Sequence, residues 1–546
     1  MKRMMGKSFT FLLAAIFCMT WLAGCGNSSS VSAPNPTGVE TNDDSSTSTT
    51  EASGDSIVAY VGTTIFDGSL DPIKGAMSYG YSFTNAALLK VDPASKYVGD
   101  MAEEWSVSDD ALVYTFKLRE NVKFSDGSDM TAADVVFSYE AVKAGQAENE
   151  NVDLTKLETV VADGDYTVVF TLSEPYSPFL DTTALLGIVP SDGYDSEAFD
   201  QNPIGTGPWK VVQYDANQQI IVEPNEYYYE GEPSIDRITL VYMDSEAALS
   251  AAHSGQLDVV MVGANYAFES VAGMTMVPLE TMDIRNISLP VQPKQEVDGV
   301  TFGNDVTSDK AVREALAIGI DRANIIENAF NGIGKPAVGF TSNLIWSNSE
   351  GYQDNRKDEA IAMLENAEWI DSDGDGIREK DGIVCEFDVY ATEDRYVLAA
   401  ALAEDAAGLG IKIIPHSSNW DEIGENMTTA SVVWGWGQFS PTVIDSLHNS
   451  TYINTGGYNN VVAYSNQEVD DLIDKALSET TQNAAVADWQ EAQSIANKDF
   501  PYIYIVNIEH CYFISDKLDI SIDTQIPHPH GHGSPIIGNM KDWQEK

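Results

Sequence analysis

Several short segments of the chain are dominated by apolar residues, and one of them, 166–172, alternates between apolar and polar residues with a period of two. They are rich in β-branched and aromatic residues, and turn sequences such as Asp126-Gly127 and Gly205-Thr206-Gly207-Pro208 separate them. We predict a strand for each, because runs of β-branched and aromatic residues bounded by turn sequences are typical of strands. The segments with this pattern are 57–61, 112–118, 166–172, 209–214, 219–223, 235–242 and 257–260.

Other segments have helical periodicity and are preceded by residues that cap helices. Thr131 is followed three residues later by Asp134, which is the spacing of a capping box. Asp321 precedes a helix that ends at Asn331-Gly332. The mixture of strands and helices predicts an α/β fold. Further helices are predicted at 245–253, 308–319 and 357–368, and a strand–helix–strand unit at 386–390, 396–409 and 411–414.

The first residues of the chain have the features of a signal peptide. Three basic residues among the first seven precede an apolar run at 9–22, which is shorter than the about 20 residues of a membrane-spanning helix. Leu22-Ala23-Gly24-Cys25 follows and resembles the bacterial lipobox, whose cysteine is lipidated and becomes the mature N-terminus. We predict that 1–24 is a lipoprotein signal peptide and that Cys25 carries lipid. The alternative is an ordinary signal peptide with a chance cysteine.

Residues 25–56 have the composition of a flexible tether. Fourteen of the 30 residues from 27 to 56 are Ser or Thr, and none is aromatic. Such a segment buries too little apolar area to offset the entropy of ordering it, and its reach as a random coil is roughly 30 Å. No later stretch approaches 18 consecutive apolar residues, so we expect no membrane-spanning segment. The predicted location is the outer face of the cell membrane, on the extracellular or periplasmic side.

Composition and charge narrow the function further. The chain has 546 residues, of which 84 are acidic and 30 basic, for a net charge of −54. A surface this negative repels phosphate backbones, which argues against nucleic acid as a partner. The four cysteines include one in the signal peptide and the predicted lipid carrier, which leaves Cys385 and Cys511. Two buried free thiols are favoured over a disulfide between them.

Four sequence blocks occur in order along the body of the chain. Each places aromatic, glycine, proline or charged residues at fixed spacing; the blocks lie between Trp105 and Arg322, and the resemblance that they carry runs in order from Lys96 to Lys546. They are Trp105-x-x-Ser108 through Tyr114-Thr115-Phe116-x-Leu118-Arg119, Val122-Lys123-Phe124-x-Asp126-Gly127 and Thr131-Ala132-x-Asp134-Val135-Val136-Phe137-Ser138; Gly205-Thr206-Gly207-Pro208-Trp209; Asn225-x-x-Tyr228-Tyr229 with Ser254-Gly255-x-x-Asp258; and Val312-Arg313-x-Ala315-Leu316-x-x-x-Ile320-Asp321-Arg322.

These blocks resemble the family 5 extracellular solute-binding proteins, which are the peptide and nickel receptors of ABC importers. The resemblance implies a type II periplasmic-binding-protein fold, an α/β fold with two lobes, an extra subdomain and a hinge that bends. On this basis 57–90, 200–290 and 502–546 form lobe I, 91–199 form its extra subdomain, and 291–501 form lobe II. The blocks themselves are mostly scaffold, and Arg313, Asp321 and Arg322 are expected at helix ends and in ion pairs.

A peptide ligand requires an arginine for its carboxylate and roomy aromatic walls for its side chains. The resemblance places Arg395 where peptide-binding members carry such an arginine, although a surface arginine paired with Asp394 or Glu393 is equally consistent. Trp434 and Trp436 alternate on a predicted strand that runs into a glycine-rich loop. They either form the floor of the cleft or pack in the core.

The peptide ammonium requires a desolvated carboxylate. Family peptide binders supply it from an Asp-Pro-type turn after a Gly-Trp segment, whereas this chain has Ser440-Pro441-Thr442. Asp445 is the candidate substitute. Tyr79 and Tyr81 follow Leu70-Asp71-Pro72, a loop that the resemblance places at the mouth of the cleft, so both are candidate ligand contacts.

Two further motifs have the composition of metal sites. His528, His530 and His532 lie within five residues and would converge on Ni²⁺, Cu²⁺ or Zn²⁺ if the loop curls; the alternative is a Gly/Pro-rich loop with solvent-facing histidines. The segment 371–382 resembles an EF-hand loop that lacks the glutamate at position 12. Its candidate calcium ligands are Asp371, Asp373, Asp375 and Glu379, and the alternative is a plain Asp/Gly turn.

The function predicted from these features is that of a monomeric, lipid-anchored substrate-binding component of an ABC importer. It would capture di- or oligopeptides in a cleft between the lobes and deliver them to a membrane permease. A receptor for nickel or a nickel chelate and a receptor for peptide pheromones remain alternatives. A secreted hydrolase is disfavoured, because the sequence has no nucleophile–base motif such as G-x-S-x-G or H-E-x-x-H. The function requires no enzyme activity and no cofactor, with Ca²⁺ and Ni²⁺ as the candidate ions.

Overall fold

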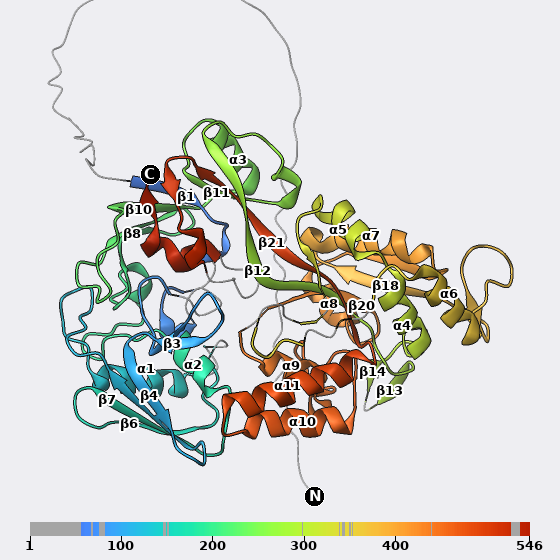
Figure 1. Cartoon of the computed structure of the whole chain (residues 1–546), viewed down its shortest axis with the longest axis horizontal. Coiled ribbons are helices and arrows are strands. Elements are labelled where there is room, and N and C mark those ends of the chain that lie inside the picture. Colours follow the sequence, from blue (N-terminus) through green and yellow to red (C-terminus); the bar gives the residue numbers. More distant parts are fainter. Residues whose placement is uncertain are drawn as a thin grey trace, which may run out of the picture. The chain divides into compact units, whose positions relative to one another are not determined.

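The computed structural model describes residues 56–546 except 67–68, 76–81, 146–148, 150–151, 298, 338, 341–343, 349–350, 352, 438 and 526–534. In the described residues, strands and helices are mixed along the chain, as the hydrophobic pattern predicts (Figure 1). The helices are α1 (Ala132–Ala144), α2 (Phe179–Leu185), α3 (Ser245–His253), α4 (Lys310–Gly319), α5 (Arg322–Phe330), α6 (Lys357–Asn366), α7 (Tyr396–Ala407), α8 (Trp420–Asn426), α9 (Thr442–His448), α10 (Gln467–Ser478) and α11 (Gln482–Asn497).

A large sheet of eleven strands forms the framework. Its order is β19-β18-β20-β12-β21-β11-β1-β10-β9-β8, with β15 also paired to β21. The strands are β1 (Ser56–Tyr60), β8 (Trp209–Asp215), β9 (Gln219–Pro224), β10 (Arg237–Val241), β11 (Val259–Val262), β12 (Met274–Ser288), β15 (Lys335–Pro336), β18 (Glu386–Ala391), β19 (Lys412–Ser417), β20 (Ser431–Trp436) and β21 (Tyr502–Ser515).

Two long antiparallel strands, β12 and β21, join the two halves of this sheet (Figure 1). They pair from Met274–Ser515 at one end to Ser288–Tyr502 at the other. β11 pairs with the end of β21 near Ser515, whereas β20 pairs with the end of β12 near Ser288. A register shift between Glu280 and Ile284 lies midway along the pair. The two halves are therefore connected through backbone hydrogen bonds as well as through the chain.

A separate four-stranded sheet has the order β4-β5-β7-β6. α1 and α2 pack with it around a core that includes Phe116, Tyr139 and Phe170. The predicted capping box of α1 is present: Thr131 Oγ1 accepts from the amide of Ala133, and the amide of Thr131 donates to Asp134. The strands are β4 (Ala102–Val107), β5 (Val113–Leu118), β6 (Leu157–Ala162) and β7 (Thr167–Leu172), with the hairpin β2 (Leu89–Val91) and β3 (Tyr97–Gly99) preceding them.

Small hairpins and buried arginines complete the scaffold. The hairpins are β13 (Gln295–Val297) with β14 (Val300–Phe302), β16 (Glu379–Lys380) with β17 (Ile383–Val384), and β22 (Leu518–Asp519) with β23 (Gln544–Glu545). Arg322 is almost fully buried and donates to Asp354 at 2.8 Å and to the carbonyl of Tyr504 at 2.6 Å. Arg313 donates to three backbone carbonyls. Both arginines therefore hold the scaffold together: Arg322 makes the predicted ion pair at the start of α5, whereas Arg313 lies within α4 and bonds to backbone carbonyls.

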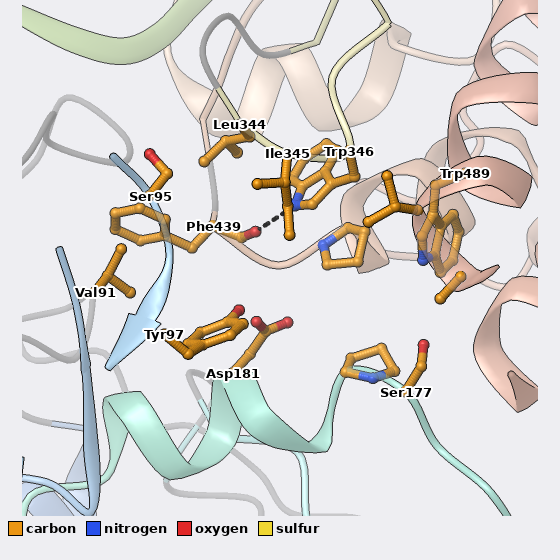
Figure 2. Close-up of a pocket in the computed structure, with 14 residues that line it drawn as sticks. Val91, Ser95, Tyr97, Ser177, Asp181, Leu344, Ile345, Trp346, Phe439 and Trp489 are labelled. Atoms are coloured by element: carbon orange, nitrogen blue, oxygen red, sulfur yellow. Dashed lines mark hydrogen bonds between the residues drawn. The ribbon is translucent and has the colours of Figure 1, made fainter. Parts of the chain in front are cut away.

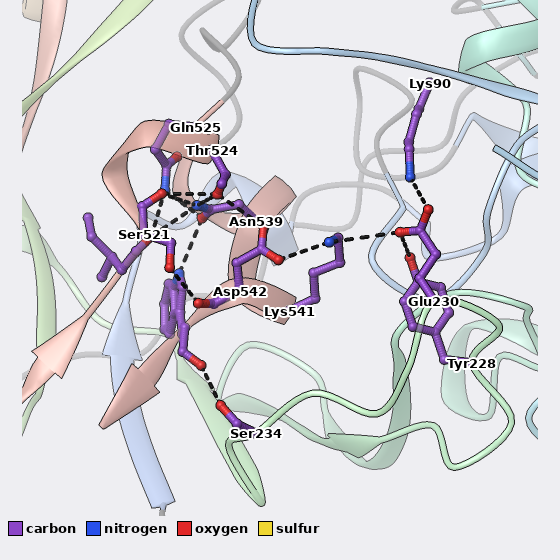
Figure 3. Close-up of polar contacts among 12 residues, drawn as sticks. Lys90, Tyr228, Glu230, Ser234, Ser521, Thr524, Gln525, Asn539, Lys541 and Asp542 are labelled. Atoms are coloured by element: carbon purple, nitrogen blue, oxygen red, sulfur yellow. Dashed lines mark hydrogen bonds and ion pairs between the residues drawn. The ribbon is translucent and has the colours of Figure 1, made fainter. Parts of the chain in front are cut away.

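A polar network fixes the C-terminal segment (Figure 3). Lys541 makes an ion pair with Asp542 at 2.9 Å and approaches Glu230 at 3.8 Å. Glu230 also accepts from Lys90 at 2.5 Å and from the Tyr228 hydroxyl at 2.9 Å. These contacts join residues near positions 90, 230 and 541, which lie far apart in the sequence.

The structure tests two sequence predictions: that the two body cysteines are not joined by a disulfide, and that no helix spans a membrane. Cys385 and Cys511 are buried free thiols, which confirms the preferred interpretation of the two body cysteines. Among the residues that the structure describes, we find no helix whose length and apolar character would carry the chain across a bilayer.

Candidate functional site

The carboxyl ends of three neighbouring strands meet at one edge of the large sheet. β18 is parallel to both β19 and β20, so the chain leaves all three strands on the same side. In open α/β sheets, ligands bind in the crevice outside such carboxyl ends. The segments that follow these strands are therefore the first place to look for a binding site. They carry Arg395 after β18, Trp420 after β19, and Trp434 and Trp436 at the end of β20.

Aromatic side chains gather at this edge. The Trp434 ring stacks against Trp420 with centroids 5.9 Å apart, and it lies 5.7 Å from Trp436 and 5.5 Å from Tyr458. Trp434 is buried, whereas Trp420 and Tyr458 are 40% and 45% exposed. We call Trp420, Trp434, Trp436 and Tyr458 the aromatic cluster. Its buried base and exposed rim provide a rigid apolar surface for a ligand.

Arg395 lies against this cluster at the start of α7. Its guanidinium carbon is 5.4 Å from the centroid of the Trp420 ring, within the range of a cation–π contact. One guanidinium nitrogen is 3.4 Å from the carbonyl oxygen of Val433. The carboxylate of Asp394 is 3.8 Å away, but that side chain is 70% exposed, so solvent screens the pair. Arg395 itself is only 7% exposed. A buried, oriented guanidinium beside aromatic rings suits recognition of a carboxylate.

Several polar groups at the same edge are buried without a hydrogen-bond partner in the described part of the chain. They are the indole N–H groups of Trp434 and Trp436 and the hydroxyls of Thr392 and Ser418. Buried donors of this kind are normally satisfied. Together with Arg395 they supply hydrogen-bond donors that a polar ligand at this edge would use.

Asp445, the predicted ammonium anchor, lies on α9. One carboxylate oxygen accepts from Asn449 at 3.0 Å and the other from the Tyr452 hydroxyl at 3.0 Å. Burial raises the pKa of Asp445, these two hydrogen bonds oppose the rise, and Asp474 and Asp470 add to it. The carboxylate is thus satisfied within its own part of the chain, and a role in ligand binding stays a prediction.

The remaining predicted ligand contacts and one metal motif cannot be placed. Tyr79 and Tyr81, the histidines His528, His530 and His532, and the predicted lipid carrier Cys25 lie outside the described residues. Their roles stay predictions.

The Asp-rich loop after α6 brings its four predicted ligands together. Carboxylate oxygens of Asp371, Asp373, Asp375 and Glu379 all lie within 4.8 Å of one another. Gly374 and Gly376, at φ +80° and +92°, allow the tight course of the loop. Carboxylates this close repel one another unless a cation lies between them, and oxygen donors suit Ca²⁺. The residues thus fit a calcium ion, which stays a prediction.

Two members of the aromatic cluster were missed by the sequence interpretation. Trp420 follows a predicted strand by a few residues, and a systematic search of segments after parallel strands would have found it. Tyr458 follows Gly456-Gly457 in an irregular segment, and nothing local marks it as a neighbour of Trp434.

Comparison with known proteins bears on both the fold and the family. The family model described as "Bacterial extracellular solute-binding proteins, family 5 Middle" matches residues 96–458. Protein XP55 of Streptomyces lividans is 29% identical to this chain, and the alignment covers 79% of each. The oligopeptide-binding protein AppA of Bacillus subtilis is 28% identical, with 83% of this chain and 86% of AppA covered.

Solved structures give the same result for the fold. NikZ from Campylobacter jejuni, in complex with Ni(L-His), is 22% identical with a TM-score of 0.70, covering 90% of this chain and 99% of NikZ. AppA from Bacillus subtilis, in complex with a nonapeptide, is 23% identical with a TM-score of 0.66 over the same shares. The fold is the type II periplasmic-binding-protein fold, as the sequence predicted. Because the family model covers more than half of the chain, this protein belongs to the bacterial extracellular solute-binding proteins of family 5.

Proposed function

We propose that this protein captures small peptides at the carboxyl edge of β18, β19 and β20 and delivers them to the permease of an ABC importer. The observation that carries the proposal is the placement of Arg395 against the aromatic cluster. A peptide carries a carboxylate, polar backbone groups and side chains of varied size. The guanidinium matches the carboxylate, the buried indole N–H groups match backbone carbonyls, and the aromatic rings accept side chains.

The relatives support the same ligand class. AppA of Bacillus subtilis is named an oligopeptide-binding protein, and DdpA of Escherichia coli, 26% identical, is named a probable D,D-dipeptide-binding protein. A binding protein releases its ligand chemically unchanged, and hinge closure would hide the peptide from water until the permease receives it.

The N-terminal sequence supports attachment to the outer face of the membrane. Cys25 would carry the lipid, and residues 25–56 would act as the tether. Metabolic labelling with a fatty acid followed by cell fractionation tests this part. The wild-type chain should take up label and sediment with membranes, and Cys25→Ala should lose both properties. An unlabelled, fully secreted wild-type chain would contradict it.

Isothermal titration tests the peptide ligand. A mixed pool of synthetic di- to pentapeptides should bind the wild-type protein. Arg395→Gln should weaken binding roughly ten- to hundredfold, because hydrogen bonds to charged groups contribute about 1.5–3 kcal/mol. Arg356→Gln is the matched control, since Arg356 is a half-exposed arginine at the start of α6 that pairs with Glu359.

The same titration distinguishes the nickel alternative. Ni²⁺ is titrated with and without free histidine. Tight nickel binding without any heat from peptides would contradict the proposal, and loss of that binding in a His528/His530/His532 triple alanine variant would assign the ion to the histidine motif. Peptide binding that Arg395→Gln leaves unchanged would contradict the role of the arginine.

A further inference from the structure

The long strands β12 and β21 divide the described chain into two halves. The first half consists of residues 56–273 and 516–546, and the second half of residues 289–501. Glu280 of β12 lies opposite Glu509 of β21, but the regular pairing of the two strands then stops and resumes only at Ile284. A bulge of this kind bends a strand and interrupts its ladder of hydrogen bonds. The two halves can therefore pivot at this break.

The halves are closed against each other beside α2. Figure 2 shows Asp181 of α2 pointing toward the facing segments of the second half, which include Trp346. Next to them, the amide and the hydroxyl of Ser177 donate to the carbonyls of Leu477 and Ala476, both at 2.8 Å. The Ser177 amide is therefore shielded from solvent only while the halves are closed.

A gap along one edge of β21 lies beside the break. β11 of the first half pairs with residues 511–514 of this strand, and β15 of the second half pairs with 506–507. In the described part of the chain, neither β11 nor β15 pairs with the three residues between these two stretches. The gap is an open cavity of about 340 Å³ whose lining includes Val262 and Phe330. It leaves room for β11 and β15 to move relative to each other when the halves pivot.

Lys335 lies on the second-half side of the break and reaches across it. Its backbone pairs with Asn507 through β15, whereas its ammonium group makes an ion pair with Glu280 and lies 3.8 Å from Glu509. The hydrogen bond with Glu280 is the main cause that raises the pKa of Lys335. Like charges directly opposite each other on paired strands are destabilising. Lys335 therefore converts a repulsive pair of carboxylates into an attractive group of three charges.

Lys335 moves with the second half, because β15 is held firmly to it. α5, which precedes β15, shares a core with β18 and β20 through Ile326. Gly334 has φ +118°, and a Cβ there would lie 2.8 Å from the side chain of Val506, so this close contact requires glycine. Glu280, by contrast, ends the stretch of β12 that pairs with β21 where β21 also pairs with β11. The ion pair between Lys335 and Glu280 thus links one half to the other.

We propose that Lys335 is an ionic clamp that holds the two halves closed when no ligand is bound. Rotation about the break would stretch the ion pair, and loss of the lysine would leave Glu280 and Glu509 to repel each other. A receptor whose closed state is already favoured requires less of the binding energy of its ligand for closure. Lys335 lies on β15, outside the strands whose carboxyl ends form the candidate site, so it acts on the hinge and is a positioning residue.

Hydrogen exchange of the Ser177 amide measures closure without any ligand. This amide is bonded to Leu477 across the two halves, so its exchange with solvent reports how often the halves separate. It should be protected in the wild type. Lys335→Gln should exchange roughly two- to fivefold faster, which is the range expected for the loss of an exposed ion pair. Lys335→Arg keeps the charge and should exchange at the wild-type rate.

Matched variants and salt separate the charge from other effects of the substitution. Lys117→Gln removes a similarly exposed lysine that pairs with a glutamate within the four-stranded sheet, and it should leave the exchange unchanged. When Glu280→Gln and Glu509→Gln are both present, the further change Lys335→Gln should have no effect. The difference between wild type and Lys335→Gln should disappear in 1 M NaCl, where the Debye length is about 3 Å. Circular dichroism checks that each variant folds.

Three results would overturn the clamp. The first is a Ser177 amide that is unprotected in the ligand-free wild type, and the second is equal exchange of wild type and Lys335→Gln at low salt. The third is faster exchange of Lys335→Gln that persists in 1 M NaCl, because packing rather than charge would then be responsible. No ligand is present in this experiment, so its result does not depend on whether peptides bind, which the titration of Arg395→Gln tests separately.

Discussion

The buried carboxylate of Asp181 predicts a specific pH dependence of stability in the absence of ligand. Its pKa in the folded protein is about 7, raised by burial from 3.8. Because the folded pKa is the higher one, the folded state binds more protons than the unfolded state between these two values. Stability from this group is therefore fully present below about pH 4 and is lost as pH rises through 7.

The size of the effect follows from the same two values. Each pH unit between them changes the free energy of unfolding by about 1.4 kcal/mol. From pH 5 to pH 8, Asp181 should lower the free energy of unfolding by about 3 kcal/mol. Asp181→Asn does not titrate, so its stability relative to wild type should rise by that amount over this range. Separation of α2 from the facing segments also exposes the carboxylate, which makes about 3 kcal/mol an upper limit.

Urea unfolding at pH 5, 6, 7 and 8, followed by tryptophan fluorescence, measures this difference. Asp192→Asn is the control, because its side chain is exposed and its stability should run parallel to wild type at all four pH values. A difference between Asp181→Asn and wild type that stays constant from pH 5 to pH 8 would refute the reasoning. So would a variant whose stability falls relative to wild type as the pH rises.

Three further predictions concern packing and metal binding. Tyr139 is fully buried and its hydroxyl has no partner among the described residues, so Tyr139→Phe should raise the free energy of unfolding by about 1 kcal/mol in urea titrations; a loss of stability would contradict this account. A Cβ on Gly205 would lie 2.0 Å from the carbonyl oxygen of Thr84, so Gly205→Ala should destabilise by more than about 2 kcal/mol. A Cβ on Gly424 would meet no described atom within 4 Å outside its own helix backbone, so Gly424→Ala in α8 should instead stabilise by about 0.5–1 kcal/mol; equal effects of the two changes would be inconsistent with the packing described. The missing glutamate predicts weak Ca²⁺ binding by the Asp-rich loop, with a Kd of about 1 mM. At that affinity 10 mM Ca²⁺ should raise the free energy of unfolding by about 1.4 kcal/mol, which would be measured as a higher Tm. Asp373→Asn should remove this increase in Tm, and Mg²⁺ should not reproduce it.

Local features of this protein were predictable from the sequence. The capping box at Thr131, the N-cap at Asp321 and the gathering of carboxylates in the Asp-rich loop each depend on residues a few positions apart. Short strands such as 113–118 were also predictable, because one face of each is buried and the alternation of residues records it. The residue spacing within each of the family-like blocks is also local, so the resemblance identified the fold.

The long strands and the candidate sites depended on tertiary structure. β12 was not predicted, because polar residues such as Asp283 and Asn286 are buried along it and interrupt the apolar pattern. Its pairing with β21 joins positions more than 200 residues apart, and nothing local encodes such a partner. The candidate sites were not predictable in full for the same reason, because their residues come from segments that are far apart in the sequence. The sequence by itself determines which side chains are present and which short segments form strands, helices and turns. The contacts of Trp434 with Trp420 and of Asp181 in α2 with Ser440 form only when distant segments pack together and exclude water.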